Sequence, residues 1–359
     1  MPTQPIRVCT DRILTGEQRR RAQERAAAEN PTNASPPAAG AEPDLRELAL
    51  ETRTLWRPGR TLRVHFLDGL PEVQAKVRQV AVEWMNHANI ALEFVQDPNA
   101  EIRISFQADD GSWSYIGTDA LGISPSKPTM NFGWLEPGTD DIEYRRVVLH
   151  EFGHALGCIH EHQHPEAGIP WDKDAVYRRY GGPPNNWSRA EIDHNLFARY
   201  ARDQTQFSQF DKQSIMLYAI PDNLTIGDYA VGWNTDLSPT DKAFIAAIYP
   251  RQVKAGEELV MGAEPVAQAI GAHGEEDLFW FAVAAEGVYT LETHGWTDVV
   301  MTLCGPDDET HTLATDDDSG RFWNAKIGRV LAPGAYAVRV RHYKPKGTGQ
   351  YRIGVRAGA

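Results

Sequence analysis

The segment 150–161 reads His-Glu-Phe-Gly-His-Ala-Leu-Gly-Cys-Ile-His-Glu and carries the strongest structural signal in the chain. On a helix, His150 and His154 are four residues apart, so both project from one face about one turn from each other. Gly157 predicts the end of that helix, because glycine tolerates the left-handed conformation that helix C-termini often need. The turn brings His160 back toward the first two imidazoles. The sequence therefore predicts one Zn²⁺ held by three histidines.

The residue after the first histidine predicts chemistry at this metal. Three neutral nitrogen ligands leave one coordination position for a water, as catalytic zinc sites require. Glu151 is placed to take a proton from that zinc-bound water as a general base. Peptide-bond hydrolysis is the predicted reaction, with protein or peptide substrates. Another zinc hydrolase, such as an amidase, and a zinc-stabilised binding or adhesion protein are the alternatives.

Two motifs resemble a known family. The string 150–161 resembles the metzincin signature, and Glu161 after the third histidine is typical of the astacin branch. Ser214-Ile-Met-Leu-Tyr218 is similar to the astacin Met-turn, which implies that Met216 lies beneath the zinc. The resemblance also implies that Tyr218 stands near the metal and shares the developing oxyanion with it. It covers about residues 53–250 and implies an α+β zincin domain with a twisted mixed sheet, an active-site helix and an irregular lower lobe.

Local patterns agree with an α+β domain. Residues 61–67 alternate as a strand should, and 141–157 are expected to form the active-site helix. Residues 101–106 read as a second strand, with Ile102 and Ile104 on one face and polar residues on the other. We expect that strand to lie at a sheet edge open to water, where an extended substrate could pair with it.

The N-terminal residues 1–52 are expected to form a pro-like segment, with a helix over 17–29 and a flexible linker after it. Cys9 stands alone on this segment. A thiolate is a strong zinc ligand, so Cys9 could occupy the open coordination position and keep a zymogen latent. The astacin resemblance implies a prosegment aspartate in this role, for which Asp11 is available. Alternatively, Cys9 packs as a small apolar residue.

The character of the chain changes after Pro250. We expect a linker over 251–275 and then a small all-β sandwich over 276–359, built from short alternating strands between turns. The stretch 277–283 and the later strands resemble the bacterial pre-peptidase C-terminal (PPC) domain, which accompanies secreted proteases. Clustered carboxylates suit Ca²⁺, so one acidic turn could bind it, although a solvated turn is the alternative; its residues are Asp316, Asp317 and Asp318.

Composition limits the classes of function. The 359 residues favour two domains, and the net charge of −13 argues against a nucleic-acid binder. Three distant cysteines cannot form a disulfide framework, and no window approaches the ~18 apolar residues of a membrane span. We expect a monomer. No secretory signal is visible in the first nine residues, whereas the family resemblance favours secretion.

Overall fold

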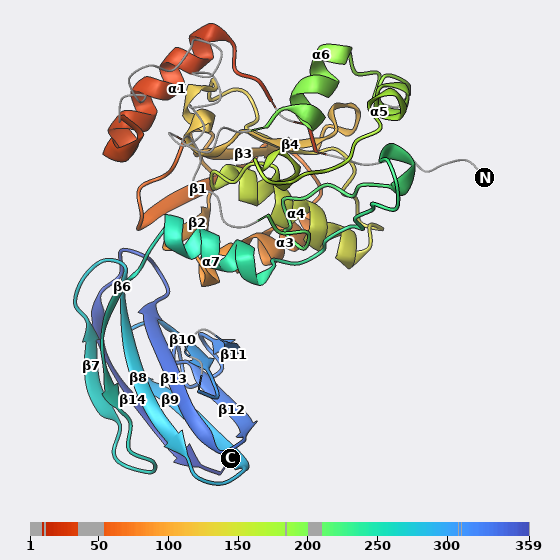
Figure 1. The fold of residues 1–359 in the computed structure, drawn as a ribbon. Coiled ribbons are helices and arrows are strands. Elements are labelled where there is room, and N and C mark those ends of the chain that lie inside the picture. Colours follow the sequence, from red (N-terminus) through yellow and green to blue (C-terminus); the bar gives the residue numbers. More distant parts are fainter. Residues whose placement is uncertain are drawn as a thin grey trace. The chain divides into compact units, whose positions relative to one another are not determined.

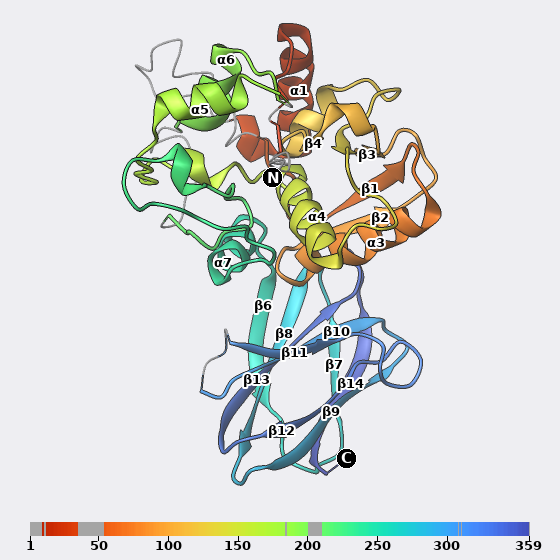
Figure 2. The same cartoon turned by 90° about the vertical axis from the view of Figure 1, so that its right-hand side faces the viewer.

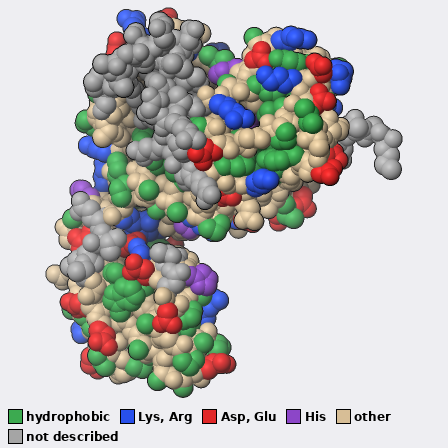
Figure 3. Space-filling view, viewed as in Figure 1, with side chains coloured by type: hydrophobic (Ala, Val, Ile, Leu, Met, Phe, Trp, Pro, Cys, Tyr) green, Lys and Arg blue, Asp and Glu red, His purple; other side chains and the backbone are tan. Residues whose placement is uncertain are grey.

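The computed structural model describes residues 9–10, 12–34, 54–183, 185–199, 210–307, 309 and 311–358. The chain divides into two compact units, which Figures 1 and 2 show from two sides. The N-terminal unit comprises Met1–Arg57, Leu62–Ala88 and Leu92–Ile248, and the C-terminal unit comprises Pro58–Thr61, Asn89–Ala91 and Tyr249–Ala359. Acidic and basic side chains are interspersed over the visible face of both (Figure 3). Within the described residues, no helix has the length and apolar character to cross a bilayer.

A five-stranded sheet organises the N-terminal unit, in the order β2-β1-β3-β5-β4. The β1–β3 and β3–β5 pairs are parallel and the β4–β5 pair is antiparallel, so the sheet is mixed. With the helices, this confirms the predicted α+β fold. The strands are β1 (Arg60–Phe66), β2 (Ile90–Phe94), β3 (Ile102–Ser105), β4 (Ser112–Ser114) and β5 (Met130–Phe132).

The expectation that residues 101–106 form an open edge is wrong. β3 lies in the middle of the sheet, between β1 and β5. Its polar side chains are buried because they have internal partners: Arg103 donates to the carbonyls of Ala100 and Lys127 at 2.7 and 2.8 Å, and Ser105 Oγ donates to Asn131 at 2.7 Å. The edge strands are β2 and β4 instead.

Helix α4 (Asp141–Ala155) is the active-site helix of the prediction, and it is buried over most of its length. Asp140 caps it by accepting a hydrogen bond from the Ile142 amide at 2.8 Å. Two indoles bind its carbonyl groups: Trp84 donates to Leu149 O and Trp56 to Ala155 O. The other helices of this unit are α1 (Gly16–Glu29), α3 (Pro71–Ala81), α5 (Lys173–Tyr180), α6 (Arg189–Ile192) and α7 (Pro239–Ile248).

Helix α1 forms where the sequence predicts it and packs within the N-terminal unit. At Gly122 a Cβ atom would lie 3.0 Å from Ala22 Cβ, so the missing side chain permits this close approach. Asn30 donates to Trp56 O at 3.1 Å, and Asn33 donates to Leu55 O at 2.8 Å. The first part of the expected linker, Pro31–Ala34, is a 3₁₀ turn, and residues 35–53 lie outside the described part of the chain.

The C-terminal unit is a β-sandwich, as predicted. One sheet has the order β11-β10-β13-β8-β6 and the other β12-β9-β14-β7. Alternate residues point into the core, such as Tyr336, Val338 and Val340. The strands are β6 (Gln252–Glu258), β7 (Val266–Ile270), β8 (Glu275–Val283), β9 (Gly287–Gly295), β10 (Val299–Cys304), β11 (Thr312–Asp316), β12 (Lys326–Leu331), β13 (Gly334–His342) and β14 (Gly349–Ala357).

The range 251–275 differs from the expected linker, because it contains β6 and β7. β6 pairs in parallel with β8, and β7 pairs antiparallel with β14. Each strand completes one sheet of the sandwich, and Val266 and Ile270 pack against its core. Strand formation here depends on partners far along the chain, which local composition does not show.

Candidate active site

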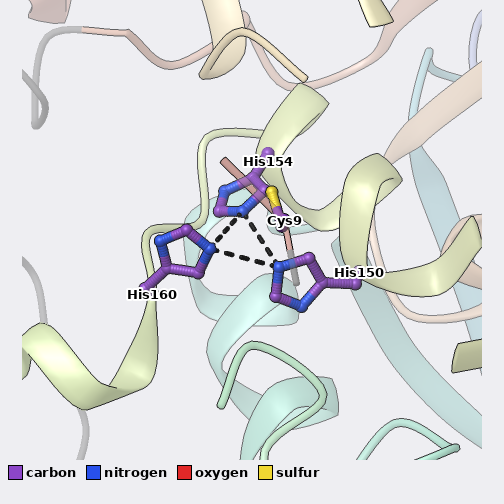
Figure 4. Close-up of side chains that lie close together, drawn as sticks. All are labelled: Cys9, His150, His154 and His160. Carbon is purple, nitrogen blue, oxygen red and sulfur yellow. Dashed lines mark hydrogen bonds between the residues drawn. The ribbon is translucent and has the colours of Figure 1, made fainter. Parts of the chain in front are cut away.

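Three imidazoles from one helix and the following turn meet at a point (Figure 4). The Nε2 atoms of His150 and His154 are 3.2 Å apart, and they lie 3.2 and 3.1 Å, respectively, from Nε2 of His160. The turn is possible because Gly157 adopts a positive φ of 99° directly after the helix. The structure thus brings together the three residues that the sequence predicts as metal ligands.

Hydrogen bonds at the far side of two rings define which nitrogen faces the centre. His150 Nδ1 lies 2.8 Å from Ile215 O, and His154 Nδ1 lies 2.8 Å from Cys158 O. We assign the proton to Nδ1 in both rings, since a carbonyl can only accept. Burial, together with the neighbouring imidazoles, holds the pKa of His150 well below its ordinary value. The Nδ1 contacts therefore leave Nε2 of both rings facing the centre of the cluster.

This arrangement fits a zinc ion. Nitrogen ligands about 2.0–2.1 Å from a tetrahedral zinc lie roughly 3.3 Å from one another, close to the observed spacings. Converging lone pairs repel unless a cation lies between them. Within the described residues, Cys9 and these three histidines form the one group whose donor atoms could hold a metal, all within 4.8 Å of one another.

The acidic turn of the C-terminal unit does not support the expected Ca²⁺ site. Asp316, Asp317 and Asp318 form no group of converging donor atoms in the described structure. The Oδ1 atom of Asp316 instead accepts hydrogen bonds from the amides of Ser319 and Lys326, at 3.1 and 2.7 Å. This carboxylate closes a turn.

Glu151 lies on α4 directly beside the three imidazoles and is buried. Its Oε2 atom accepts a hydrogen bond from Cys9 Sγ, 3.2 Å away and 142 residues earlier in the sequence. In Figure 4 the Cys9 sulfur points toward the histidine cluster from a separate segment. The carboxylate therefore faces the same space as the Nε2 atoms.

The segment that carries Cys9, called the strap (residues 9, 10 and 12–15), runs along the sheet edge. Cys9 pairs in parallel with Ser112 of β4, and the Thr10 amide donates to Ser112 O at 3.3 Å. Arg12 forms an ion pair with Asp110, and its guanidinium lies 4.3 Å from the centre of the Trp113 ring. Asp11, the other predicted latency residue, lies outside the described residues.

Tyr218 is buried beside the cluster. Its hydroxyl donates to the Cys9 carbonyl at 2.6 Å, and its ring centre lies 4.4 Å from that of His160. A main-chain carbonyl in the cleft is thus within reach of this phenol.

Met216 and Glu161 contact the helix and the turn that carry the three histidines. A Cβ at Gly153 would lie 2.5 Å from the Met216 sulfur, so glycine lets this methionine pack against α4 between the two histidines. Met216 O accepts from the Glu161 amide at 3.0 Å. Glu161 Oε1 accepts from the Asp211 amide at 2.8 Å. Burial, opposed by this hydrogen bond, raises the pKa of Glu161 to about 8.

Asp241 is a supporting residue that the sequence did not single out. Its carboxylate accepts from Ser214 Oγ at 2.7 Å and from the Ile215 amide at 2.8 Å. Ile215 in turn orients His150 through its carbonyl, so Asp241 acts on the ligand set through one intermediate residue. Its only sequence signal is its place in Ser238-Pro-Thr-Asp241, which predicts a helix start.

His162 lies next to the cluster, and the sequence predicts it to be a surface residue or an orienting neighbour rather than a metal ligand. Its Nε2 atom lies 2.7 Å from Asn195 O, and its ring centre lies 4.4 Å from that of Tyr218. It is therefore buried beside the site but does not belong to the ligand group. Sequence spacing leaves open whether it is a surface residue or an orienting neighbour.

The geometry agrees with two comparisons. Residues 50–223 match the family model described as Astacin, a family of peptidases. A solved structure of myroilysin is 52% identical to this chain, with a TM-score of 0.54, over 55% of this chain and 97% of that chain. The chain belongs to the astacin family. Its predicted relationship is therefore confirmed.

Two further comparisons gave more distant similarities. The zinc metalloproteinase nas-19 of Caenorhabditis elegans is 26% identical over 165 residues, which is 46% of this chain and 36% of that protein. The chain thus spans about a third of the length of the curated relatives it matches. The pre-peptidase C-terminal domain of collagenase from Bacillus anthracis is 18% identical, covering 30% of this chain and 96% of that chain, with a TM-score of 0.25. The sandwich assignment itself follows from the strand pairing.

Proposed function

We propose that this astacin-family protein is a zinc-dependent endopeptidase that hydrolyses peptide bonds of protein substrates. The observation that carries the proposal is the meeting of three Nε2 atoms, 3.1–3.2 Å apart, beside the buried carboxylate of Glu151. Zinc at this point supplies Lewis-acid chemistry, which polarises the scissile carbonyl and lowers the pKa of a coordinated water toward about 7. His150, His154 and His160 would hold it.

Glu151 is the general base. It already accepts a hydrogen bond from a group that stands over the three imidazoles, the thiol of Cys9. When the strap leaves, water takes the place of that thiol. Glu151 then removes a proton from the attacking water and delivers it to the leaving amine.

Tyr218 stabilises the oxyanion. Its hydroxyl donates to a main-chain carbonyl in the cleft, that of Cys9, at 2.6 Å. A substrate carbonyl in the same place would receive the same hydrogen bond, which strengthens as negative charge develops on the oxygen.

The edge strand β4 binds the substrate. Two contacts support this role: Cys9 pairs with Ser112 of β4, and the Thr10 amide donates to Ser112 O. They place a main chain along this edge, within reach of Glu151 and Tyr218. Main-chain hydrogen bonds to β4 would hold a peptide of any sequence, and side-chain pockets would add selectivity.

The strap keeps the enzyme latent. The thiol of Cys9 lies within 4.8 Å of the donor nitrogens of the three histidines. It donates a hydrogen bond to Glu151, and the Cys9 carbonyl accepts one from the Tyr218 hydroxyl. Both groups are therefore unavailable to a substrate. Tethering gives such a ligand an effective concentration in the millimolar range. The docked helix α1 and the Arg12–Asp110 ion pair hold the strap in position.

The peptidase proposal is tested on a proteome-derived peptide library. Zinc-loaded protein with Cys9→Ala should cleave peptides, stop after chelation and resume when zinc is added back. The same protein with Glu151→Gln should keep its zinc and lose roughly 10²–10⁴-fold in turnover. Cleavage that persists with Glu151→Gln, or that ignores chelation, would reject the proposal.

Latency has its own test. Full-length Cys9→Ala should hydrolyse a small peptide at least about tenfold faster than the unmodified chain, because a tethered thiol no longer competes with water. Cys304→Ala is the matched control, since it removes a buried thiol from the C-terminal unit. Equal rates for all three proteins would show that Cys9 does not inhibit.

A further inference from the structure

A small cavity opens beside the two residues to which the proposed function assigns chemistry, Glu151 and Tyr218. Its volume is about 10 Å³, and Cys9 also borders it. The cavity therefore adjoins the position that a main chain takes when it crosses the cleft. A substrate side chain next to the scissile bond would enter here.

One wall of the cavity is formed by charged and aromatic side chains that interact with one another. Arg146 donates to Glu143 through Nε and Nη2, at 2.8 and 2.6 Å, in a bidentate ion pair. Glu143 also accepts from Trp134 Nε1 at 2.9 Å. The ring of Trp233 lies over the guanidinium, 4.0 Å from its carbon to the ring centre. Arg146, Trp134 and Trp233 all line the cavity.

The backbone next to Trp233 is also held. The side-chain amide of Asn234 donates to Lys212 O at 2.9 Å and to Ser214 O at 2.8 Å. Trp233 itself is 43% exposed, so its ring forms the boundary between the cavity and solvent. The position of the Trp233 ring is therefore set by its contact with the Arg146 guanidinium and by the hydrogen bonds of Asn234, rather than by burial in the core.

The size of the cavity decides what it can receive. With Cys9 in place, the cavity of about 10 Å³ holds roughly one water molecule. A substrate main chain that replaces the strap fills the position of Cys9 again. The space beside it then takes a methyl or hydroxymethyl group with little adjustment, whereas a leucine or phenylalanine side chain does not fit. Departure of the strap removes only Cys9 from the lining. The remaining walls, including both indoles, belong to the N-terminal unit and stay.

The charge of Arg146 does not select among substrate side chains. Arg146 is 8% exposed and already shares its charge with the Glu143 carboxylate. We infer that Trp233 is a specificity-determining residue that restricts the substrate side chain next to the scissile bond to Gly, Ala or Ser. This inference rests on the proposed peptidase function and names its substrate preference.

The test compares cleavage profiles of full-length, zinc-loaded proteins that all carry Cys9→Ala. The parent should enrich Gly, Ala and Ser at one position next to the cleaved bond. Adding Trp233→Ala should admit Leu and Phe there, raising kcat/KM for a Leu peptide relative to its Ala counterpart by about 10–200-fold. Trp233→Phe keeps a smaller ring and should give an intermediate ratio. Trp296→Ala, which removes an 85% exposed indole from the C-terminal unit, should leave the ratio as in the parent.

An unchanged profile with Trp233→Ala would overturn this inference while leaving the peptidase proposal intact. A parent that already prefers large side chains at both positions next to the bond would also overturn it. Failure of the parent to cleave any peptide in a zinc-dependent way is a different result, which counts against the proposed function.

Discussion

Both units bury paired polar groups, but the N-terminal unit also buries a cluster whose acceptor atoms face one another. In the C-terminal unit, donors meet acceptors: Tyr351 OH donates to Asp277 at 2.7 Å, and Arg339 donates to Glu276 at 2.9 Å. In the N-terminal unit, the three histidine Nε2 atoms and the Glu151 carboxylate instead face a common space. Paired groups stabilise a core, whereas converging acceptors need a ligand from outside the chain. Burial of polar groups alone therefore does not indicate a functional site. Convergence of their acceptor atoms on one point does.

The largest effect is expected when one of the converging acceptors is removed. His160→Ala should abolish stoichiometric zinc binding, which metal analysis after dialysis would measure. His162→Ala is the matched control, because this buried imidazole is two residues away but lies outside the ligand group. Full zinc content in both variants would mean that the three-histidine site is wrong.

The next prediction compares a tyrosine in each unit. Tyr218→Phe should lower kcat by up to about 10²-fold and change KM less, because an oxyanion donor is lost. Tyr351→Phe should instead leave kcat unchanged and lower the stability of the sandwich by about 1–3 kcal/mol, since the Asp277 carboxylate loses a donor. A fall in melting temperature without a fall in kcat for Tyr218→Phe would place that residue with the core tyrosines.

A third prediction concerns support that acts through another residue. Asp241→Ala should weaken zinc binding by about 10–100-fold, because the Ile215 carbonyl no longer holds the His150 ring in place. A zinc titration with a competing chelator measures this. Asp277→Ala in the C-terminal unit is the counterpart, and it should leave zinc affinity as it is. Equal affinities for both variants would remove Asp241 from the site.

The smallest effect on the site is expected from the sandwich core. Ile353→Ala empties space among fully buried apolar residues and should cost about 2–5 kcal/mol of unfolding free energy in that unit. Zinc content should not change. A chain ending at Pro250 tests the same independence and should still bind zinc. Loss of zinc from either protein would show that the two units depend on each other.

Much of the site could be predicted because its parts are close in sequence. His150, Glu151 and His154 share a helix, so the helical repeat alone places them on one side. The fold class could be predicted for a similar reason, since alternation and helical spacing are local. The strands within 251–275 were missed because their stability comes from partners such as β8 and β14, far along the chain.

What the sequence by itself determined is the spacing of three histidines, one glutamate and one glycine. That spacing leaves few geometries open, and it predicts both the metal ligands and the class of reaction. Tertiary structure alone decided which strand is the edge, where Cys9 lies and which carboxylate orients His150. Those features join residues that are far apart in the chain. The arrangement of the histidines and Glu151 follows from local backbone geometry. The long-range features follow from sheet order and from the packing of distant segments, which no short-range sequence pattern predicts.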